Sequence, residues 1–506
     1  MKPLNGDSAV LCHIESPVKV SDPRVADAYV QKREAHIMNP CLSLRLAMAL
    51  SLTLATLAHA TKPRLLVLTD MGGDPDDQQS MVRLLLYANE YELEGLIATA
   101  TRNRVNPDQI RERIEAYRQV YPNLTVHAEG YPEPDHLLSL VKTGRPKRYM
   151  ESVGEGKSTE ASRHIIEVVD KDDSRPVWVN IWGAGTDFAQ ALWDVRNTRT
   201  PEEVEAFVGK LRVYDIAGQD DSGGWICHNF PHIFYIRSVL QFQAISVREA
   251  RPFPMEVTGH NLETFTNEWV DNHIQNHGPL GRLYPDRHWK YEGDTPAFLH
   301  VLPNGLSDPE RVHQGNWGGR FAPMKTRNPG SFNRRNVVAE KAHRDFEMYT
   351  EAADTWSWKE HRYKDSRFAP IFRWREAFQH DFAARMDWSV TERYEDANHN
   401  PRAILNGDRS RNVLYLTVKR GEPVTLSAEG SSDSDDDRLS FTWMHYKEPG
   451  THAGDIQFEA QGEDAVQFRA PEVWGPETIH VVLTVKDSGD PPLCAYRRAV
   501  ITVNRN

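Results

Sequence analysis

The sequence predicts an α/β domain with a doubly wound, mostly parallel sheet, followed by an all-β sandwich. Two patterns support this fold class. Apolar runs of strand length alternate with helical patterns between residues 64 and 299, and short alternating runs separated by polar turns fill the last hundred residues. A chain of 506 residues is also too long for one hydrophobic core. We expect the first domain to span residues 61–397 and the second to span residues 398–506.

The stretch from Arg64 to Ala88 predicts the first strand, loop and helix. Leu65 to Leu68 form an apolar run that suits a buried strand, and apolar residues recur at helical spacing from Met81 to Ala88. Ligands bind at the carboxyl ends of strands in open α/β sheets, which is where the intervening loop lies. That loop carries four carboxylates, those of Asp70, Asp74, Asp76 and Asp77. Such close acids repel one another unless a cation or protons intervene, so a Ca²⁺ or Mg²⁺ site is favoured over an Asp-rich helix cap.

Further strands and helices follow in alternation. We expect strands at Leu96–Ala100, Val177–Trp182 and Leu211–Ile216, and helices at Pro107–Tyr121 and Ser158–Val169. This alternation predicts a parallel sheet with helices on both faces. The stretch from Asn304 to Trp388 has no simple periodicity, and within it Trp317 and Arg320 either contact a sugar or pack in the interior.

The loop TDMGGDPDD resembles that of the nucleoside hydrolase superfamily, in which the first strand ends in a DxDPGxDD loop that holds Ca²⁺ and ribose hydroxyls. It is most similar to a secreted branch described as cellulose-binding proteins with a nucleoside-hydrolase-like domain. An ungapped alignment pairs Asp70 with the first Asp of the motif and puts Gly72 at the second. The resemblance therefore leaves the catalytic base open between Asp70 and Asp74.

Three later segments extend this resemblance. Asn103 takes the place of an Asn that binds ribose, although Arg102 replaces the usual Gly before it. Thr186, in GAGTDFAQAL, matches a Thr whose backbone carbonyl binds calcium, and Asp294 matches the late Asp that completes the calcium shell. The plain alternatives are a turn-forming Asn at residue 103 and a helix cap at residue 186.

Two positions depart from the hydrolase pattern. Asn229 matches the amide of the family's AEFN motif, but Cys227 stands where the Glu would be. Gly293 replaces a His that protonates the leaving nucleobase. Because these departures affect ribose recognition and the leaving group, a different glycoside is favoured over a nucleoside.

Carried over to this chain, the resemblance implies a role for each candidate residue. Asp70 or Asp74 would be the catalytic base. The sugar would be held by Asp76, Asn103 and Asn229, and Ca²⁺ would be held by Asp70, Asp77, the Thr186 carbonyl and Asp294.

Short alternating runs after the turn-rich segment Asn398–Asp408 predict a β-sandwich, similar to the immunoglobulin-like C-terminal domain of the same family. Trp443 is expected in its core. The acidic stretch Asp433–Asp437 either binds Ca²⁺ or forms a charged hairpin tip, and the hairpin tip is the favoured interpretation.

The stretch Met38–Ala60 has the features of a secretory signal peptide: Arg45, an apolar stretch and a final Ala-His-Ala. A buried helix is the alternative. Residues 1–37 would then be an extension before the true start at Met38. Export would place the mature protein in the periplasm or outside the cell, without a membrane span. Only Cys227 and Cys494 lie beyond the cleavage point, and we expect no disulfide between them.

The leading hypothesis is an exported, Ca²⁺-dependent glycosidase-like hydrolase that cleaves the glycosidic bond of a furanoside or another sugar. The alternative is a non-catalytic carbohydrate-binding protein, for cellulose or a similar polysaccharide, with a structural metal site. The formal net charge of −12 argues against a nucleic-acid partner. The signal peptide disfavours an intracellular nucleoside salvage enzyme, and the sequence is compatible with a homo-oligomer.

Overall fold

The structure, a computed structural model, describes residues 62–245, 259–286, 291–326 and 346–505. The expected extension 1–37 and signal peptide 38–60 lie outside the described residues. Within the described ranges, every helix is too short or too polar to cross a bilayer.

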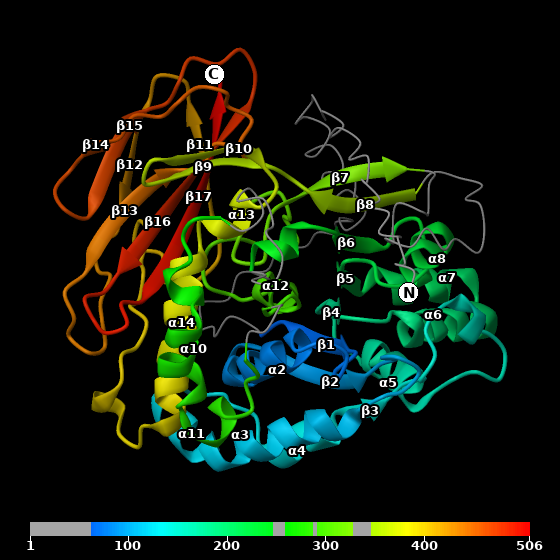
Figure 1. Ribbon diagram of the computed structural model, residues 1–506. Helices are drawn as coiled ribbons and strands as arrows, with labels where there is room; N and C mark the ends of the chain where they lie inside the picture. Colours follow the sequence, from blue (N-terminus) through cyan, green and yellow to red (C-terminus); the bar gives the residue numbers. More distant parts are fainter. Residues whose placement is uncertain (1–61, 246–258, 287–290, 327–345, 506) are drawn as a thin grey trace, which may run out of the picture. The chain divides into compact units, whose positions relative to one another are not determined.

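The main sheet has the strand order β3-β2-β1-β4-β5-β6-β8-β7, which Figure 1 shows from β3 at the bottom to β7 at the top. Every neighbouring pair from β3 to β8 is parallel, and β7 is antiparallel to β8. The order reverses between β1 and β4, so the expected doubly wound α/β fold is confirmed. The strands are β1 (Arg64–Thr69), β2 (Glu92–Ala98), β3 (Val141–Thr143), β4 (Val177–Ile181), β5 (Leu211–Ile216), β6 (Phe234–Ser238), β7 (Phe321–Thr326) and β8 (Phe346–Glu351).

Both faces of this sheet are covered by helices. Leu65 and Val67 of β1 belong to one apolar core, whereas Leu66 and Leu68 belong to the core on the other face. The helices are α2 (Asp76–Leu86), α3 (Pro107–His127), α4 (Pro134–Ser139), α5 (Glu160–Asp170), α6 (Thr186–Thr198), α7 (Pro201–Gly209), α8 (Ser222–Asn229), α10 (Asn267–Val270), α11 (Gly278–Gly281), α12 (Thr295–Leu299), α13 (Ala369–Phe372) and α14 (Arg375–Val390). Short helical turns are η1 (Ala88–Glu90), η2 (Met150–Ser152), η3 (Gln241–Ala244), η4 (Glu263–Phe265), η5 (Asp271–Gln275) and η7 (Tyr394–Asp396).

Two stretches differ from the sequence-based expectation. Helix α3 continues through Pro122 to His127, because the buried side chains of Leu124 and His127 hold its last turns against the core. The stretch without periodicity contributes β7, β8, α13, α14 and the hairpin of β9 (Asp354–Trp358) with β10 (His361–Ser366). Its Trp317 is 2% exposed, and its Arg320 is buried with Nε 2.6 Å from Asp354 Oδ1, so both residues pack in the interior.

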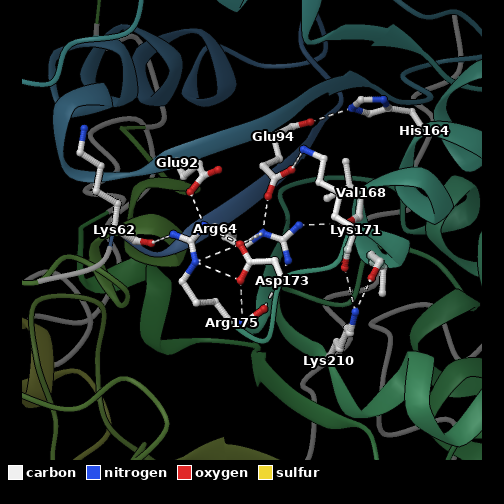
Figure 2. Close-up of polar contacts among 11 residues, drawn as sticks. Lys62, Arg64, Glu92, Glu94, His164, Val168, Lys171, Asp173, Arg175 and Lys210 are labelled. Atoms are coloured by element: carbon white, nitrogen blue, oxygen red, sulfur yellow. Dashed lines mark hydrogen bonds and ion pairs between the residues drawn. The ribbon is translucent and has the colours of Figure 1, made fainter.

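An ion-pair network lies at the amino ends of β1 and β2 (Figure 2). Arg64 contacts Glu94, which also pairs with Lys171, and Arg175 lies 2.6 Å from Glu92. Asp173 joins Arg64 at 3.7 Å and Arg175 at 2.5 Å. Three cations and three carboxylates are therefore paired in this network.

The C-terminal part is all-β, as expected. One sheet has the order β11-β17-β16-β13 and the other β12-β15-β14, and a shared apolar core fills the space between them. Trp443 is half-buried and packs against that core. Cys227 and Cys494 are both free thiols. The strands are β11 (Leu414–Lys419), β12 (Pro423–Ser427), β13 (Ser440–His445), β14 (Glu459–Ala460), β15 (Ala465–Arg469), β16 (Glu477–Lys486) and β17 (Cys494–Asn504).

Candidate functional site

The acidic loop lies where the strand order reverses. It leaves β1 at Asp70 and enters α2 at Asp76, while the neighbouring strand β4 leads into α6 through Gly183 and Gly185. Crevices at such a reversal are the usual ligand sites of open α/β sheets. The fold therefore places the loop at the position where a small ligand is expected.

Three carboxylates of this loop converge. Asp74, Asp76 and Asp77 each offer an oxygen within 4.8 Å of the others. Asp76 and Asp77 are buried in the first turn of α2, and Asp74 is half-buried. The Thr69 hydroxyl donates a hydrogen bond to Asp77 Oδ1. Burial raises the pKa of Asp77 well above its usual value, and the charges of Asp70, Asp76 and Asp74 add to this effect.

Asp70 lies outside this converging group, although its charge has the largest effect of the three on the pKa of Asp77. Its Oδ2 forms an ion pair with Arg148, whose Nε donates to the Ala100 carbonyl at 2.9 Å. Arg148 Nη1 also lies 3.4 Å from Gln219 Oε1. A Cβ at Gly183 would lie 2.1 Å from Asp70 Oδ1, so the close approach of β4 to this carboxylate requires a glycine.

The converging carboxylates suit a hard divalent cation. Ca²⁺ takes six to eight oxygen ligands and accepts irregular geometry. A cation would relieve the repulsion that raises the pKa of Asp77. Of the four ligands implied by the resemblance, only Asp77 belongs to the converging group, which also contains Asp74 and Asp76, expected as base and sugar ligand. The donors fit Ca²⁺, and Asp77 is common to the converging group and to the ligand set implied by the resemblance.

Asp294 is buried at the start of α12, directly before Thr295. The Thr295 hydroxyl lies 3.0 Å from that of Ser80 on α2, and the neighbouring Glu292 lies 2.8 Å from Arg83 Nε. These contacts dock the start of α12 beside α2. Asp294 does not join the converging group among the residues that the structure describes.

Thr186 opens α6, and its hydroxyl donates to Asp220 Oδ2 at 2.9 Å. Burial raises the pKa of its neighbour Asp187 to about 6, although Thr159 donates to that carboxylate at 2.7 Å. Burial likewise raises the pKa of Asp221 to about 6. The carboxyl ends of β4 and β5 therefore add further acidic groups to this edge of the sheet.

The two candidate amides lie in different places: Asn103 is in a turn beside the acidic loop, where its neighbour Arg104 lies 3.2 Å from the Gly72 carbonyl, and Asn229 is on α8. Asn103 is exposed in a tight turn, with a φ of 65°, which agrees with the turn-forming alternative. Asn229 is the last residue of α8, where Arg196 donates to its side-chain oxygen at 2.5 Å. Because α8 runs back from the carboxyl edge, the structure does not bring Asn229 to the acidic loop. Cys227, on the same helix, is buried in the core.

Three residues beside the loop were not identified from the sequence. Arg148 forms an ion pair with Asp70. Gln219 donates to the Trp182 carbonyl, and Asn106 donates to the Met71 carbonyl at 2.8 Å. Arg148 follows a strand of three residues in a polar segment, so no local pattern marks it. Asn106 directly precedes α3, and its place before a predicted helix was the feature of the sequence that could have identified it.

Comparison with protein families gives two matches. A model described as "Cellulose-binding Sde182, nucleoside hydrolase-like domain" matches residues 64–321. A second, described as "Cellulose-binding protein Sde0182, C-terminal domain", matches residues 423–503. No curated protein matches the chain.

Among solved structures, a nucleoside hydrolase-related hypothetical protein from Saccharophagus degradans, associated with carbohydrate metabolism, is 39% identical with a TM-score of 0.74. The match covers 88% of this chain and 100% of that one. A type III effector, XopQ, complexed with adenosine diphosphate ribose is 10% identical over 66% of this chain and 96% of that one, with a TM-score of 0.33. The second likeness is too low to support an inference.

Proposed function

The chain belongs to the family of cellulose-binding proteins with a nucleoside-hydrolase-like domain, and from this premise we propose that it is an exported carbohydrate-binding protein. In this proposal, its α/β domain binds sugar hydroxyls at the carboxyl edge of the main sheet. A Ca²⁺ ion held by Asp74, Asp76 and Asp77 takes part in that binding. The signal-peptide pattern of residues 38–60 supports export.

The observation that carries this proposal is the division of the loop into two parts. Asp74, Asp76 and Asp77 converge, whereas Asp70 is held by Arg148. Binding needs oxygen ligands and acceptors for sugar hydroxyls, which the converging group supplies. Hydrolysis would also need a free base and a leaving-group acid. Asp70 is paired, which leaves Asp74 as the candidate base, and Gly293 has no side chain that could donate a proton to the leaving group.

A second surface favours polysaccharide as the ligand. Trp474, in the β-sandwich, is 84% exposed, and the Arg505 guanidinium carbon lies 5.8 Å from its ring centroid. An exposed indole offers a flat apolar face to the apolar face of a sugar ring. The sandwich thereby has a surface suited to an extended glycan chain.

Hydrolysis of a glycosidic bond is the second candidate function, and the half-buried position of Asp74 beside two buried carboxylates favours it. When bound, Ca²⁺ would lower the pKa of a water ligand. Asp74 would accept the proton from that water, and Asp76 would accept a hydrogen bond from a sugar hydroxyl.

The test uses the protein from Thr61 onward. Binding to microcrystalline cellulose and to soluble glucans is measured with Ca²⁺ and with chelator, together with product release from p-nitrophenyl furanosides, nucleosides and glucans. We expect chelator and Asp77→Asn to weaken binding of soluble glucans at least tenfold. Asp172→Asn, at an exposed aspartate between α5 and β4, is the matched control and should leave binding unchanged.

Trp474→Ala should reduce cellulose binding, whereas Tyr415→Ala, at an aromatic residue that is 56% exposed, should not. Loss of binding in Trp474→Ala together with normal, chelator-insensitive binding in Asp77→Asn would overturn the role of the α/β site. Product release that disappears with chelator and in Asp74→Asn would establish the hydrolase instead.

A further inference from the structure

A second group of carboxylates lies in the β-sandwich, in the loop between β12 and β13. Asp433, Asp435 and Asp437 each offer an oxygen within 4.8 Å of the others. The hairpin-tip interpretation of this acidic stretch requires carboxylates that point apart into solvent. These three are half-buried and point together.

The loop backbone explains how alternate residues converge. Asp433 Oδ1 accepts hydrogen bonds from the amides of Asp435 at 2.8 Å and Asp437 at 3.4 Å. Asp436 between them has a φ of 62° and is exposed. The second oxygen of Asp433, Oδ2, is buried and has no hydrogen-bond partner in the part of the chain that the structure describes.

Asp487, directly after β16, provides an independent observation. It is 5% exposed, and its Oδ1 accepts hydrogen bonds from the amides of Leu493 at 2.8 Å and Gly489 at 3.1 Å. Its Oδ2 is buried without a hydrogen-bond partner among the described residues. A buried carboxylate oxygen without a donor is costly unless a cation or a proton compensates for it.

The segment that carries Asp487 lies beside the acidic loop. The hydroxyl of the next residue, Ser488, donates to Asp437 Oδ1 at 2.9 Å, which holds the two segments together. Two buried carboxylate oxygens without donors, those of Asp433 and Asp487, therefore lie on two segments that are hydrogen-bonded to each other.

The same group binds the segment that connects the two domains. The His399 amide donates to Asp435 Oδ2 at 2.7 Å, and His399 Nδ1 lies 3.0 Å from Asp435 Oδ1. His399 Nε2 in turn lies 3.0 Å from Nδ1 of His127 on α3. The Asn398 amide lies 3.3 Å from Asp487 Oδ1.

We propose that Asp433, Asp435, Asp437 and Asp487 form a Ca²⁺ site that fixes the connecting segment 398–399 against the β-sandwich. The donors are all hard oxygens, and four carboxylates exceed what a Mg²⁺ ion, with its demand for octahedral geometry and retained waters, usually takes from protein. This site is separate from the loop of the α/β domain, so it does not depend on the function proposed for that loop.

The test is Ca²⁺ titration by calorimetry on the whole protein from Thr61 onward, in the Asp77→Asn background so that the α/β loop contributes no binding. We expect one remaining Ca²⁺ site. Adding Asp487→Asn or Asp433→Asn should weaken that site at least tenfold. Asp436→Asn is the matched control in the same loop, because Asn tolerates the left-handed backbone there, and it should bind as the background does.

Tb³⁺ luminescence excited through nearby aromatic residues gives a second readout. The Tyr394 hydroxyl donates to the Ser434 hydroxyl at 2.8 Å, so bound Tb³⁺ would be sensitised by that ring. Far-ultraviolet circular dichroism verifies that each variant is folded, and Asp433→Asn replaces Asp487→Asn if the latter does not fold. A background variant that binds no Ca²⁺, or folded Asp433→Asn and Asp487→Asn variants that bind it normally, would overturn the proposal.

Discussion

The two ends of strand β1 differ in how their charges are balanced. At the amino edge, Arg64 begins the strand inside a network of three cations and three carboxylates (Figure 2). At the carboxyl edge, Asp70 pairs with Arg148, and the next three carboxylates converge on one another. One strand thus has a neutralised end and an end that carries unbalanced negative charge.

This difference separates stability from function. A neutralised edge lowers the cost of burying Arg64 and Glu94, which are 0% and 3% exposed. An edge with excess carboxylates gains nothing in stability from their repulsion, and perturbed acids in such clefts mark functional sites. The carboxyl edge is therefore the part of the sheet that a ligand would complete.

The largest expected effect is an opposite pH dependence at the two edges. Burial raises the pKa of Asp215, on β5 near the carboxyl edge, to about 7. The folded state then holds this proton more tightly than the unfolded state, so stability falls as pH rises from about 4 to 7, by up to about 4 kcal/mol. Asp215→Asn should flatten this part of the curve, as measured by urea unfolding at a series of pH values.

The amino edge should behave in the other direction. Hydrogen bonds from Arg175 hold the pKa of Asp173 well below its usual range. Ionised Asp173 therefore stabilises the folded state above about pH 4, and this stabilisation is lost as the pH falls further. Asp173→Asn therefore serves as the control, with no effect between pH 4 and 7. If the free energy of unfolding of Asp215→Asn depends on pH as that of the wild type does, Asp215 is not the group that causes the fall in stability.

The second prediction removes a cation from the balanced edge. Arg64→Met leaves the buried Glu94 with Lys171, whose side chain is 55% exposed, as its remaining ion-pair partner. We expect a loss of about 3 kcal/mol in the free energy of unfolding, since breaking a buried pair leaves an uncompensated charge. Arg393→Met, at an arginine whose side chain is 65% exposed, should cost less than about 1 kcal/mol in the same measurement.

The third prediction adds a methyl group at the carboxyl edge. In Gly183→Ala the new Cβ would meet the Asp70 carboxylate at 2.1 Å, which forces that side chain away from Arg148. We expect a loss of about 2 kcal/mol. Gly209→Ala in α7, where no atom lies within 4 Å of the new Cβ, should be neutral or slightly stabilising. Equal losses of stability in both variants would contradict the inference that the nearby Asp70 carboxylate is the reason why residue 183 is a glycine.

The smallest expected effect tests whether the ion pair between Arg148 and Asp70 limits Ca²⁺ binding by the acidic loop. Arg148→Met releases Asp70 from its ion pair and gives the acidic loop a fourth available carboxylate. Ca²⁺ affinity of the loop should rise about tenfold, or about 1.4 kcal/mol, by calorimetry. Arg104→Met, which removes a contact with the Gly72 carbonyl at 3.2 Å, is the control for a general change in loop packing. Weaker binding in Arg148→Met would show that Asp70 must stay paired.

Most of the fold could be predicted because it rests on local periodicity. The apolar run Leu65–Leu68 lies within β1, and the expected strand Leu211–Ile216 has the bounds of β5. Strands β8 and β9 were not predicted, because Phe346–Glu351 and Asp354–Trp358 alternate polar and apolar residues over only a few positions, within a stretch that has no wider periodicity. Their pairing depends on partners distant in the sequence.

The candidate site was predictable only in part. Asp74, Asp76 and Asp77 are neighbours in sequence, so a local motif places them together. The pairing of Asp70 with Arg148 joins two loops that are distant along the chain, and no local pattern contains that information. Asn229 was chosen by motif position, but the direction of α8 carries it back toward the start of β6.

Strand β7 has a consequence for behaviour at high local concentration. It ends the main sheet among the described strands, and it carries Pro323 in its middle and Lys325 with a side chain that is 61% exposed. A proline has no amide hydrogen to offer, and a lysine charge repels a second copy of the same strand. Copies of this protein crowded on an insoluble surface would therefore resist joining edge to edge into aggregates.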